Sequence, residues 1–447
     1  MTWTSPPQPS SPSLDDPGRP DQPGGASGLS RRQFLVGAGV LGTAAATLGV
    51  LASTRPWDQV AKPTSASSAS ASGPLVLVTL YGGNDGLNTV IPYTDPAYLS
   101  LRPNLGYQPS QVLPLAEGLA LNPKLPGLLS LWKSGQLAIV RGVSYPSPNL
   151  SHFASMAIWQ TANVTDGTGS GWLGRWLDSA GDGPERAISI GATLPPALRG
   201  DKEAAAAITG PTLTLPGDSA FQKAYAAMQT PSPDRVGLVA DVATSGRDLL
   251  GIRQRLANLQ APASGGGGGD TGTGGTHPTG AGSGLAGPNG ITAALGVVSD
   301  LIVAGASAQV YQVSLASFDT HAEEKVNHER LLSELDGAVT AFFKALDGSS
   351  HAKNVVLMTY SEFGRRPAEN ASGGTDHGTA APLFVAGPNV QGGKFYGEQP
   401  SLTRLDADGN LISNVDFRQV YATVLEKAVG SDPAAVLGGQ FQTLAFV

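Results

Sequence analysis

The sequence predicts an α/β protein with a doubly wound, mostly parallel sheet and helices on both of its faces. Short apolar runs alternate along the chain with longer helical patterns, which is the order of strands joined by crossover helices. The runs are continuous, as in strands that are buried on both faces. The chain has 447 residues, of which 40% are hydrophobic, enough for one large core. We therefore expect a single α/β domain over residues 74–447.

The expected strands and helices follow one another in a regular order. The strands are expected at 75–80, 137–140, 310–315, 355–358 and 383–385. The helices are expected at about 153–161, 234–259, 291–305, 322–346 and 416–428. Residues 261–290 interrupt this order with five consecutive glycines, and such a composition cannot bury enough apolar surface to offset its chain entropy. We interpret this stretch as a disordered insertion, because candidate site residues fall on both sides of it.

The N-terminal region has the pattern of a twin-arginine export signal. Arg31 and Arg32 precede an uncharged, mildly apolar run from Val36 to Ala52, and a Pro-, Ser- and Gly-rich stretch comes before them. A short membrane-spanning helix is the alternative, but the run is at the low edge of spanning length. We assign 1–52 to the signal region and 53–73 to a Ser/Ala-rich linker. The protein is thus expected to be exported, with the twin-arginine translocase as its partner during export.

Composition excludes several classes of function. The chain has no cysteine, which excludes disulfides, thiolate zinc sites, iron–sulfur clusters and a cysteine nucleophile. The formal net charge is −7 and no long basic run occurs, which argues against nucleic acid as a partner.

Polar residues at the ends of the expected strands are the candidate site residues, because ligands of open α/β sheets bind beyond the carboxyl ends of the strands. The candidates in these loops are Asn84, Asp85, Ser151, His152, Asp319, His321, Arg365, Asp376 and His377. Carboxylate with imidazole is the ligand set of zinc, manganese or iron, whereas oxygen ligands alone suit calcium or magnesium.

Other readings of single residues compete with a metal site. Asp85 could serve only as a turn or helix-cap residue, and Ser151 could cap the helix that begins near Phe153. His328 and His351 are interpreted as surface residues, and His277 as a bystander in the insertion. The stretch from Asp406 to Asn410 is interpreted as a hairpin turn, not a calcium loop, because it lacks the later glutamate.

Six ordered motifs lie between about residue 74 and the C-terminus, outside the insertion. They are Leu77-Val78-Thr79-Leu80-Tyr81-Gly82-Gly83-Asn84-Asp85-Gly86-Leu87-Asn88, Ser151-His152-Phe153, Gly171-Trp172-Leu173-Gly174-Arg175, Phe318-Asp319-Thr320-His321, Ser361-Glu362-Phe363-Gly364-Arg365 and Thr375-Asp376-His377-Gly378. Together they resemble the family called domain of unknown function 1501. That family is grouped with the alkaline phosphatase and sulfatase superfamily. The resemblance therefore implies an alkaline phosphatase/sulfatase-like core and a two-metal site.

The resemblance also assigns roles to residues. It implies metal ligation by Asp85, Asp319, His321, Asp376 and His377, and Ser151 as the nucleophile. Beside these roles, the chemistry of ester binding leads us to expect that Arg365 or Arg175 clamps an ester oxygen, and Asn84 is a further candidate for substrate binding. The two-residue spacing of Asp319 and His321 departs from the superfamily pattern. The superfamily also uses a further histidine near the C-terminus, but no histidine follows His377 here, and His152 could take that role. Ser144 and Ser147 are rival nucleophiles.

Three hypotheses for function follow. The first is an exported hydrolase of phosphate or sulfate esters that depends on divalent metal (zinc, manganese, calcium or magnesium), with a small molecule or a polymer as substrate. The second is a non-catalytic exported protein of the same fold that binds a partner or polymer at the cell surface. The third is a hydrolase that uses Ser151 and His152 without metal. Three explanations of the departures from the superfamily pattern stay open at this point: the site holds one metal, the ligands are rearranged, or catalysis has been lost.

Overall fold

The computed structural model describes residues 72–180, 183–210, 217–230, 232, 236–260 and 290–447. All described residues belong to one compact unit of the chain. The expected signal region, most of the linker and the glycine-rich insertion up to residue 289 lie outside the described residues. No helix in the described part is both long enough and apolar enough to cross a membrane.

A nine-stranded sheet forms the centre of the fold, in the order β13-β5-β12-β9-β1-β8-β6-β7, with β14 paired to β5. Its strands are β1 (Leu75–Leu80), β5 (Leu137–Ser144), β6 (Ala187–Ile190), β7 (Ala206–Ile208), β8 (Val310–Leu315), β9 (Val356–Tyr360), β12 (Ala381–Ala386), β13 (Lys394–Tyr396) and β14 (Val415–Asp416). All pairings are parallel except the two that β12 makes, with β5 and with β9. The expected mostly parallel sheet is confirmed.

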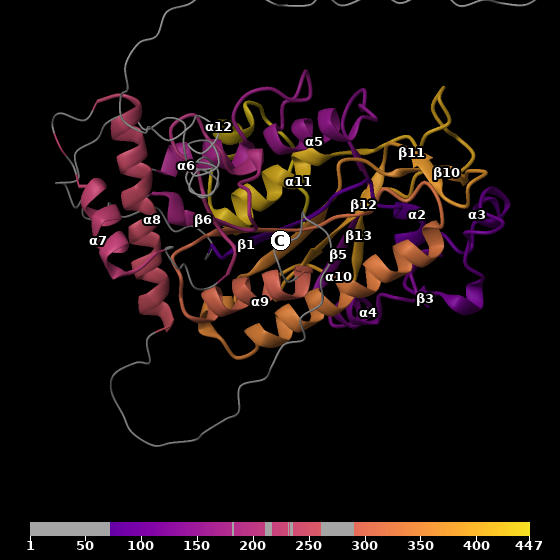
Figure 1. The fold of residues 1–447 in the computed structure, drawn as a ribbon. Helices are drawn as coiled ribbons and strands as arrows, with labels where there is room; N and C mark the ends of the chain where they lie inside the picture. Colours follow the sequence, from indigo (N-terminus) through magenta and orange to yellow (C-terminus); the bar gives the residue numbers. More distant parts are fainter. Residues whose placement is uncertain (1–71, 181–182, 211–216, 231, 233–235, 261–289) are drawn as a thin grey trace, which may run out of the picture. The chain divides into compact units, whose positions relative to one another are not determined.

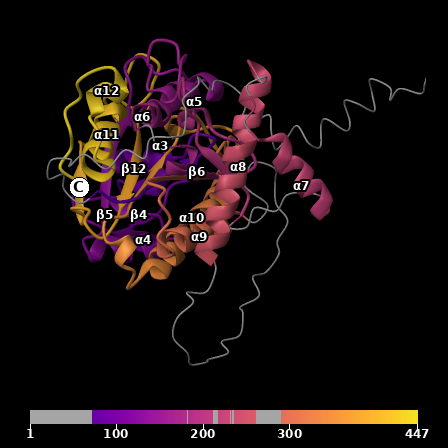
Figure 2. The same ribbon diagram turned by 90° about the vertical axis from the view of Figure 1, so that its left-hand side faces the viewer.

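Helices cover both faces of this sheet (Figures 1 and 2). One face carries α4 (Pro126–Lys133), α9 (Gly290–Val303) and α10 (Glu324–Leu346), and the other carries α5 (His152–Thr161), α6 (Trp172–Ala180), α11 (Phe417–Val424) and α12 (Pro433–Leu437). Side chains of a strand alternate between faces, so Val76 and Val78 of β1 join the first core and Leu75 and Leu77 join the second. This confirms the doubly wound arrangement.

Smaller elements surround the sheet. Helices α2 (Gly86–Thr89) and α3 (Pro96–Leu101) follow β1, and α7 (Ser219–Met228) and α8 (Leu238–Gln260) precede the insertion. β2 (Val90–Ile91), β3 (Leu113–Pro114) and β4 (Ala120–Leu121) form a small antiparallel sheet, and β10 (Arg365–Glu369) pairs with β11 (Thr375–His377) in a hairpin. The sequence did not predict these short strands, because two or three residues carry too little periodicity to detect.

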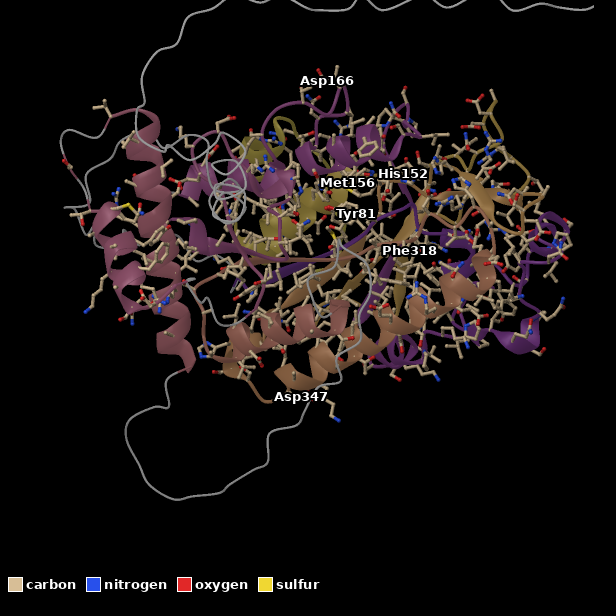
Figure 3. The ribbon with its side chains drawn as sticks, in the orientation of Figure 1. Tyr81, His152, Met156, Asp166, Phe318 and Asp347 are labelled. Atoms are coloured by element: carbon tan, nitrogen blue, oxygen red, sulfur yellow. The ribbon has the colours of Figure 1, made fainter. Side chains whose placement is uncertain are left out.

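The register of the three central strands brings three loops to one edge of the sheet. Leu75 of β1 pairs with Val310 of β8 on one side and with Val356 of β9 on the other, all in parallel. The carboxyl ends of β1, β8 and β9 therefore lie together, and the loops that follow them begin at the same edge. Figure 3 labels Tyr81 and Phe318 from two of these loops, with His152 at the start of α5 close by.

Candidate functional site

One group of charged side chains lies at this edge and is partly open to solvent; we call it the open group. It consists of His152, Asp319, His321, Asp376 and His377. Asp319 is at its centre, since the Nε2 atoms of His152, His321 and His377 lie 3.4, 3.1 and 3.3 Å from its carboxylate oxygens. His321 Nε2 and His377 Nε2 are 3.0 Å apart, and Asp376 Oδ1 is 3.5 Å from His321 Nδ1. Four of the five expected metal ligands therefore come together, with His152 as a fifth member.

The outer nitrogens of two of these histidines are held by hydrogen-bond acceptors. His377 Nδ1 donates to the carbonyl oxygen of Leu150 at 2.8 Å, and His152 Nδ1 donates to Glu362 Oε1 at 2.8 Å. In a neutral ring this leaves each Nε2 without a proton and turned toward Asp319. His152 Nε2 is buried and has no hydrogen-bond partner. Such outer hydrogen bonds are what orients histidines that ligate metal.

Glu362 is a site residue that the sequence analysis did not single out. Its side chain is buried, and Oε1 accepts from the Gly82 amide at 2.9 Å as well as from His152. The hydrogen bond from His152 to Glu362 raises the pKa of His152, against the opposing effect of burial. The available signal was a carboxylate in the same strand-end loop as Arg365, three residues before it.

Arg365 is not free to clamp a substrate, which corrects the expectation for this residue. Its guanidinium is buried, with Nε donating to Gly83 O at 2.7 Å, Nη1 to Thr375 O at 2.9 Å and Nη2 to Phe318 O at 3.1 Å. Nη2 also donates to Asp319 Oδ1 at 2.7 Å. Burial would raise the pKa of Asp319, but the contacts with Arg365 outweigh it and the pKa is lowered. Arg365 therefore holds Asp319 charged and in place.

Arg175 likewise has a structural position. Its guanidinium donates to the carbonyl oxygens of Val436, Thr161 and Ser170, which ties α6 to neighbouring segments. Its hydrogen-bonding capacity is thus used by the backbone, and the expectation that it binds substrate is not supported.

Ser151 lies beside the open group. It is the N-cap residue of α5, but its hydroxyl makes no capping hydrogen bond, and the residue is exposed. The carbonyl of the preceding residue, Leu150, is the group that holds His377. Among the described residues no hydrogen bond joins Ser151 to His152, whose ring nitrogens face Glu362 and Asp319. The rival Ser144 is buried in β5, whereas Ser147 is exposed.

A second group, which we call the buried group, contains Asp85, Arg102, Glu324 and His328. The carboxylate and imidazole ligand atoms of its three acidic and histidine members lie within 4.8 Å of one another, and all four residues are at most 1% exposed. Arg102 Nη1 and Nη2 donate to Asp85 Oδ2 and Oδ1 at 2.5 and 2.9 Å. Asp85 is thus paired with an arginine and is not part of the open group. His328 is a core residue, so the prediction that it lies on the surface was wrong.

Asn84 belongs to the surroundings of the buried group. Its Oδ1 lies 2.9 Å from His328 Nε2, its Nδ2 donates to Thr89 Oγ1 at 3.0 Å, and the residue is buried. Asn84 is therefore enclosed by protein atoms, and the expectation that it contacts substrate is not supported.

The buried group carries no net charge at neutral pH. Burial, reinforced by the nearby Asp85, raises the pKa of Glu324 to about 9, so this carboxyl group is protonated. Burial lowers the pKa of His328 to about 4, so the ring is neutral. For Asp85, burial is outweighed chiefly by Arg102, and its pKa falls well below the usual range. The remaining charges, on Asp85 and Arg102, neutralise each other.

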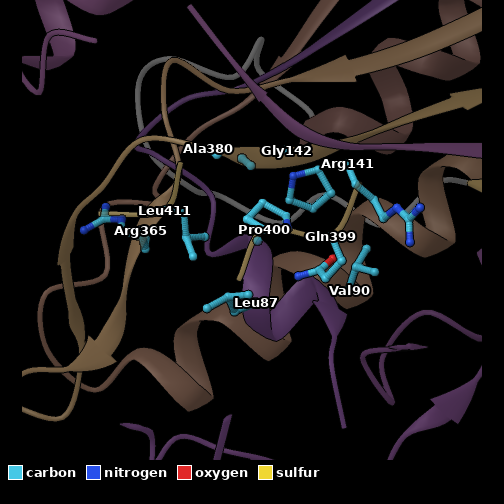
Figure 4. A pocket seen from close by; sticks show the side chains of 12 residues that line it. Leu87, Val90, Arg141, Gly142, Arg365, Ala380, Gln399, Pro400 and Leu411 are labelled. Atoms are coloured by element: carbon cyan, nitrogen blue, oxygen red, sulfur yellow. The ribbon is translucent and has the colours of Figure 1, made fainter. Parts of the chain in front are cut away.

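A small cavity and the turn at residues 406–410 were further candidates for a ligand site, and neither has the form of one. A cavity near the open group is lined by Arg365 and by Gly86, Arg141, Ala380 and Pro400, among others (Figure 4). This cavity has room for about one water molecule. In the turn, Asp406 Oδ1 accepts hydrogen bonds from the amides of Asp408 and Asn410, which confirms the expected hairpin turn.

Several solved structures are similar to this chain at low identity. A protein in the alkaline phosphatase superfamily from Vibrio parahaemolyticus is 9% identical over 83% of this chain and 68% of that one, with a TM-score of 0.36. The lipoteichoic acid synthase LtaP from Listeria monocytogenes is 10% identical over 72% and 67%, with a TM-score of 0.32. The phosphonate monoester hydrolase SpPMH from Silicibacter pomeroyi is 9% identical over 82% and 77%, with a TM-score of 0.32. Because these TM-scores are low, the fold assignment rests on the sheet of this chain.

Sequence comparison identifies the family directly. No curated protein matches the chain. The model of the family described as "Protein of unknown function (DUF1501)" matches residues 218–443, just over half of the chain. This match includes Asp319, His321, Asp376 and His377, whereas His152 and Asp85 lie before it. The chain therefore belongs to the DUF1501 family of proteins of unknown function.

Proposed function

We propose that the protein is an exported metal-dependent hydrolase of phosphate or sulfate esters, with the open group as its metal centre and Ser151 as its nucleophile. One observation carries the proposal: three imidazole Nε2 atoms lie 3.1–3.4 Å from the carboxylate of Asp319. Two of these rings are fixed from behind by Leu150 and Glu362. His152 Nε2 is buried without a hydrogen-bond partner, and a metal ion at this position would satisfy it.

The donor set of the open group suits a transition metal. Zinc–nitrogen bonds of 2.0–2.1 Å in a tetrahedron place neighbouring ligand atoms about 3.3 Å apart, and the contacts of the open group are close to that spacing. Imidazole ligands favour zinc over calcium and magnesium, which prefer oxygen ligands. When bound, such an ion would polarise the ester and stabilise the charge that develops on its oxygens.

The chain's own residues would carry the rest of the reaction. Ser151 Oγ would bond to phosphorus or sulfur as the bond to the leaving alcohol breaks, and water would then release the acid from the serine. Arg365 keeps Asp319 ionised, and Glu362 and Leu150 keep His152 and His377 oriented. The positive end of α5 at Ser151 favours negative charge on that hydroxyl.

Metal content and turnover test the metal centre. Purified wild type is expected to contain zinc or manganese and to cleave an aryl phosphate or an aryl sulfate. His377→Ala should lose both properties, whereas the matched control His351→Ala, at an exposed position in a short turn, should keep them. A metal-loaded protein without turnover on either ester class would favour the non-catalytic alternative. A folded protein without metal would refute the metal centre.

The nucleophile and the export signal have separate tests. Ser151→Ala should abolish turnover without loss of metal, and Ser147→Ala is the matched control in the same loop. Retained activity in Ser151→Ala would point to direct attack by water.

For export, replacing Arg31 and Arg32 together by lysine should stop appearance of the protein outside the cytoplasm, because the paired arginines are the feature that the translocase recognises.

A further inference from the structure

We infer that the protein holds a single metal ion, because the guanidinium of Arg102 occupies the position at Asp85 that a second cation would need. This inference rests on the proposed function for the open group and concerns the number of ions that serve it. Each group offers carboxylate and imidazole ligand atoms within 4.8 Å of one another: those of Asp319, His152 and His377 in the open group, and those of Asp85, Glu324 and His328 in the buried group. Their contacts decide which of them is able to bind an ion.

Arg102 uses both oxygens of Asp85. Nη1 donates to Oδ2 and Nη2 to Oδ1, while the Leu87 amide donates to Oδ1 at 3.2 Å. The guanidinium is also held on its other side, where Nε donates to Pro367 O at 2.8 Å and Nη2 to Arg366 O at 2.9 Å. The side chain is fully buried. An ion at Asp85 would have to displace a fully buried arginine and would remove its hydrogen bonds to the carbonyl oxygens of Pro367 and Arg366.

The remaining ligand atoms of the buried group are largely engaged as well. Glu324 Oε2 accepts from Thr375 Oγ1 at 2.6 Å, and His328 Nε2 faces Asn84 Oδ1. Two buried atoms lack a partner, Glu324 Oε1 and His328 Nδ1. A proton on Glu324 Oε1, donated toward Asp85, accounts for the first, and the unprotonated nitrogen of a neutral ring accounts for the second. Arg102 thus neutralises the charge of Asp85, and the proton neutralises Glu324, so the two carboxyl groups need no metal ion.

The open group differs from the buried group in how its arginine binds the aspartate and in its exposure to solvent. Arg365 reaches only Oδ1 of Asp319 and leaves Oδ2 toward His152 Nε2, and the Asp319 side chain is 45% exposed. An ion therefore has access, an unshared carboxylate oxygen and unprotonated imidazole nitrogens in this group. The geometry assigns the single ion to the open group and a fixed organic cation to the buried group.

Zinc stoichiometry after equilibrium dialysis of the mature protein tests the inference. We expect one zinc per chain in wild type, one in Glu324→Gln and none in Asp319→Asn. Glutamine keeps the shape and a donor of protonated Glu324, so the variant should fold, whereas it would weaken a true ligand. Two zincs in wild type would overturn the inference even if Glu324→Gln did not fold. So would loss of zinc in folded Glu324→Gln. A wild type without zinc would overturn the single ion together with the proposed function, whereas two zincs would overturn the single ion alone.

Discussion

The open group and the buried group are built from the same residue types, yet they are arranged for different tasks. Both combine an aspartate, histidine and an arginine at the carboxyl end of a central strand, and both tie distant segments together. In the buried group the arginine saturates the aspartate and solvent is absent. In the open group the arginine binds only one oxygen of the aspartate, and imidazole nitrogens of three histidines lie close to its carboxylate. We therefore propose that pairing and access, more than composition, separate a ligand site from a structural ion pair.

The largest expected effect is on catalysis, in the open group. Asp319→Asn removes the charge on which three histidines converge. An ion contributes several kcal/mol of transition-state stabilisation, so its loss should lower kcat/KM about 10³-fold. Steady-state kinetics on the best aryl ester check this, with thermal unfolding to show that the fold is kept. If Asp319→Asn stayed active, the open group would not depend on the charge of Asp319 for catalysis, and the proposed difference in task between the open and buried groups would be wrong.

The next largest effect should be on stability, in the buried group. Asp85→Ala leaves Arg102 buried without its partner, which should lower the free energy of unfolding by about 3–5 kcal/mol. Urea unfolding measures this loss. The control is Asp376→Ala, whose side chain is exposed and which should change stability by about 0.5 kcal/mol or less. Equal losses in both variants would show that burial is not what separates the groups.

A moderate effect is expected behind the open group. Glu362→Gln weakens the acceptor that orients His152, and such outer partners typically contribute 10- to 100-fold to metal affinity. Zinc affinity measured by chelator competition should therefore fall by about that factor. Glu369→Gln is the matched control, because that carboxylate binds the Asn104 and Leu105 amides instead. Unchanged zinc affinity in Glu362→Gln would refute the positioning role.

The smallest effect is a shift in pH dependence. The hydrogen bond to Glu362 raises the pKa of His152, so protons compete with metal at higher pH than they would at an ordinary histidine. Burial lowers the pKa of His377, which stays neutral further into acid. Zinc affinity should therefore decline as pH falls, first through protonation of His152. In Glu362→Gln the onset of this decline should move to lower pH, and titrations of zinc affinity against pH would show the shift or its absence.

The sequence was sufficient for the sheet centre and for most of the open group. β1 and β8 were predicted at their observed bounds because they are continuous apolar runs. Parallel neighbours then bring the loops after them to one edge, which accounts for the meeting of Asp319 with residues far away in the chain. The partner of each arginine was not predictable in this way, because a long side chain reaches residues that no sequence spacing specifies, as in the 264-residue separation of Arg102 from Arg366.

The misjudged burial of His328 had a detectable signal. On α10, Leu331, Leu332 and Leu335 follow it at spacings of three, four and seven, which places the histidine on the apolar stripe of the helix. Glu324, four residues earlier, lies on the same stripe. A helical pattern evaluated with its polar members included predicts that both face the core. It does not predict that Arg102 and Asp85 lie beside them as a buried ion pair.

Arg365 has a consequence for how tightly a ligand can be held. One guanidinium binds carbonyl oxygens of Gly82 and Gly83 after β1, of Phe318 after β8 and of Thr375 in β11. These segments therefore lose their conformational entropy when the chain folds, and little of it remains to be lost when a ligand arrives. An apo protein prepared by chelation should accordingly recover its ion quickly and without rearrangement of the backbone.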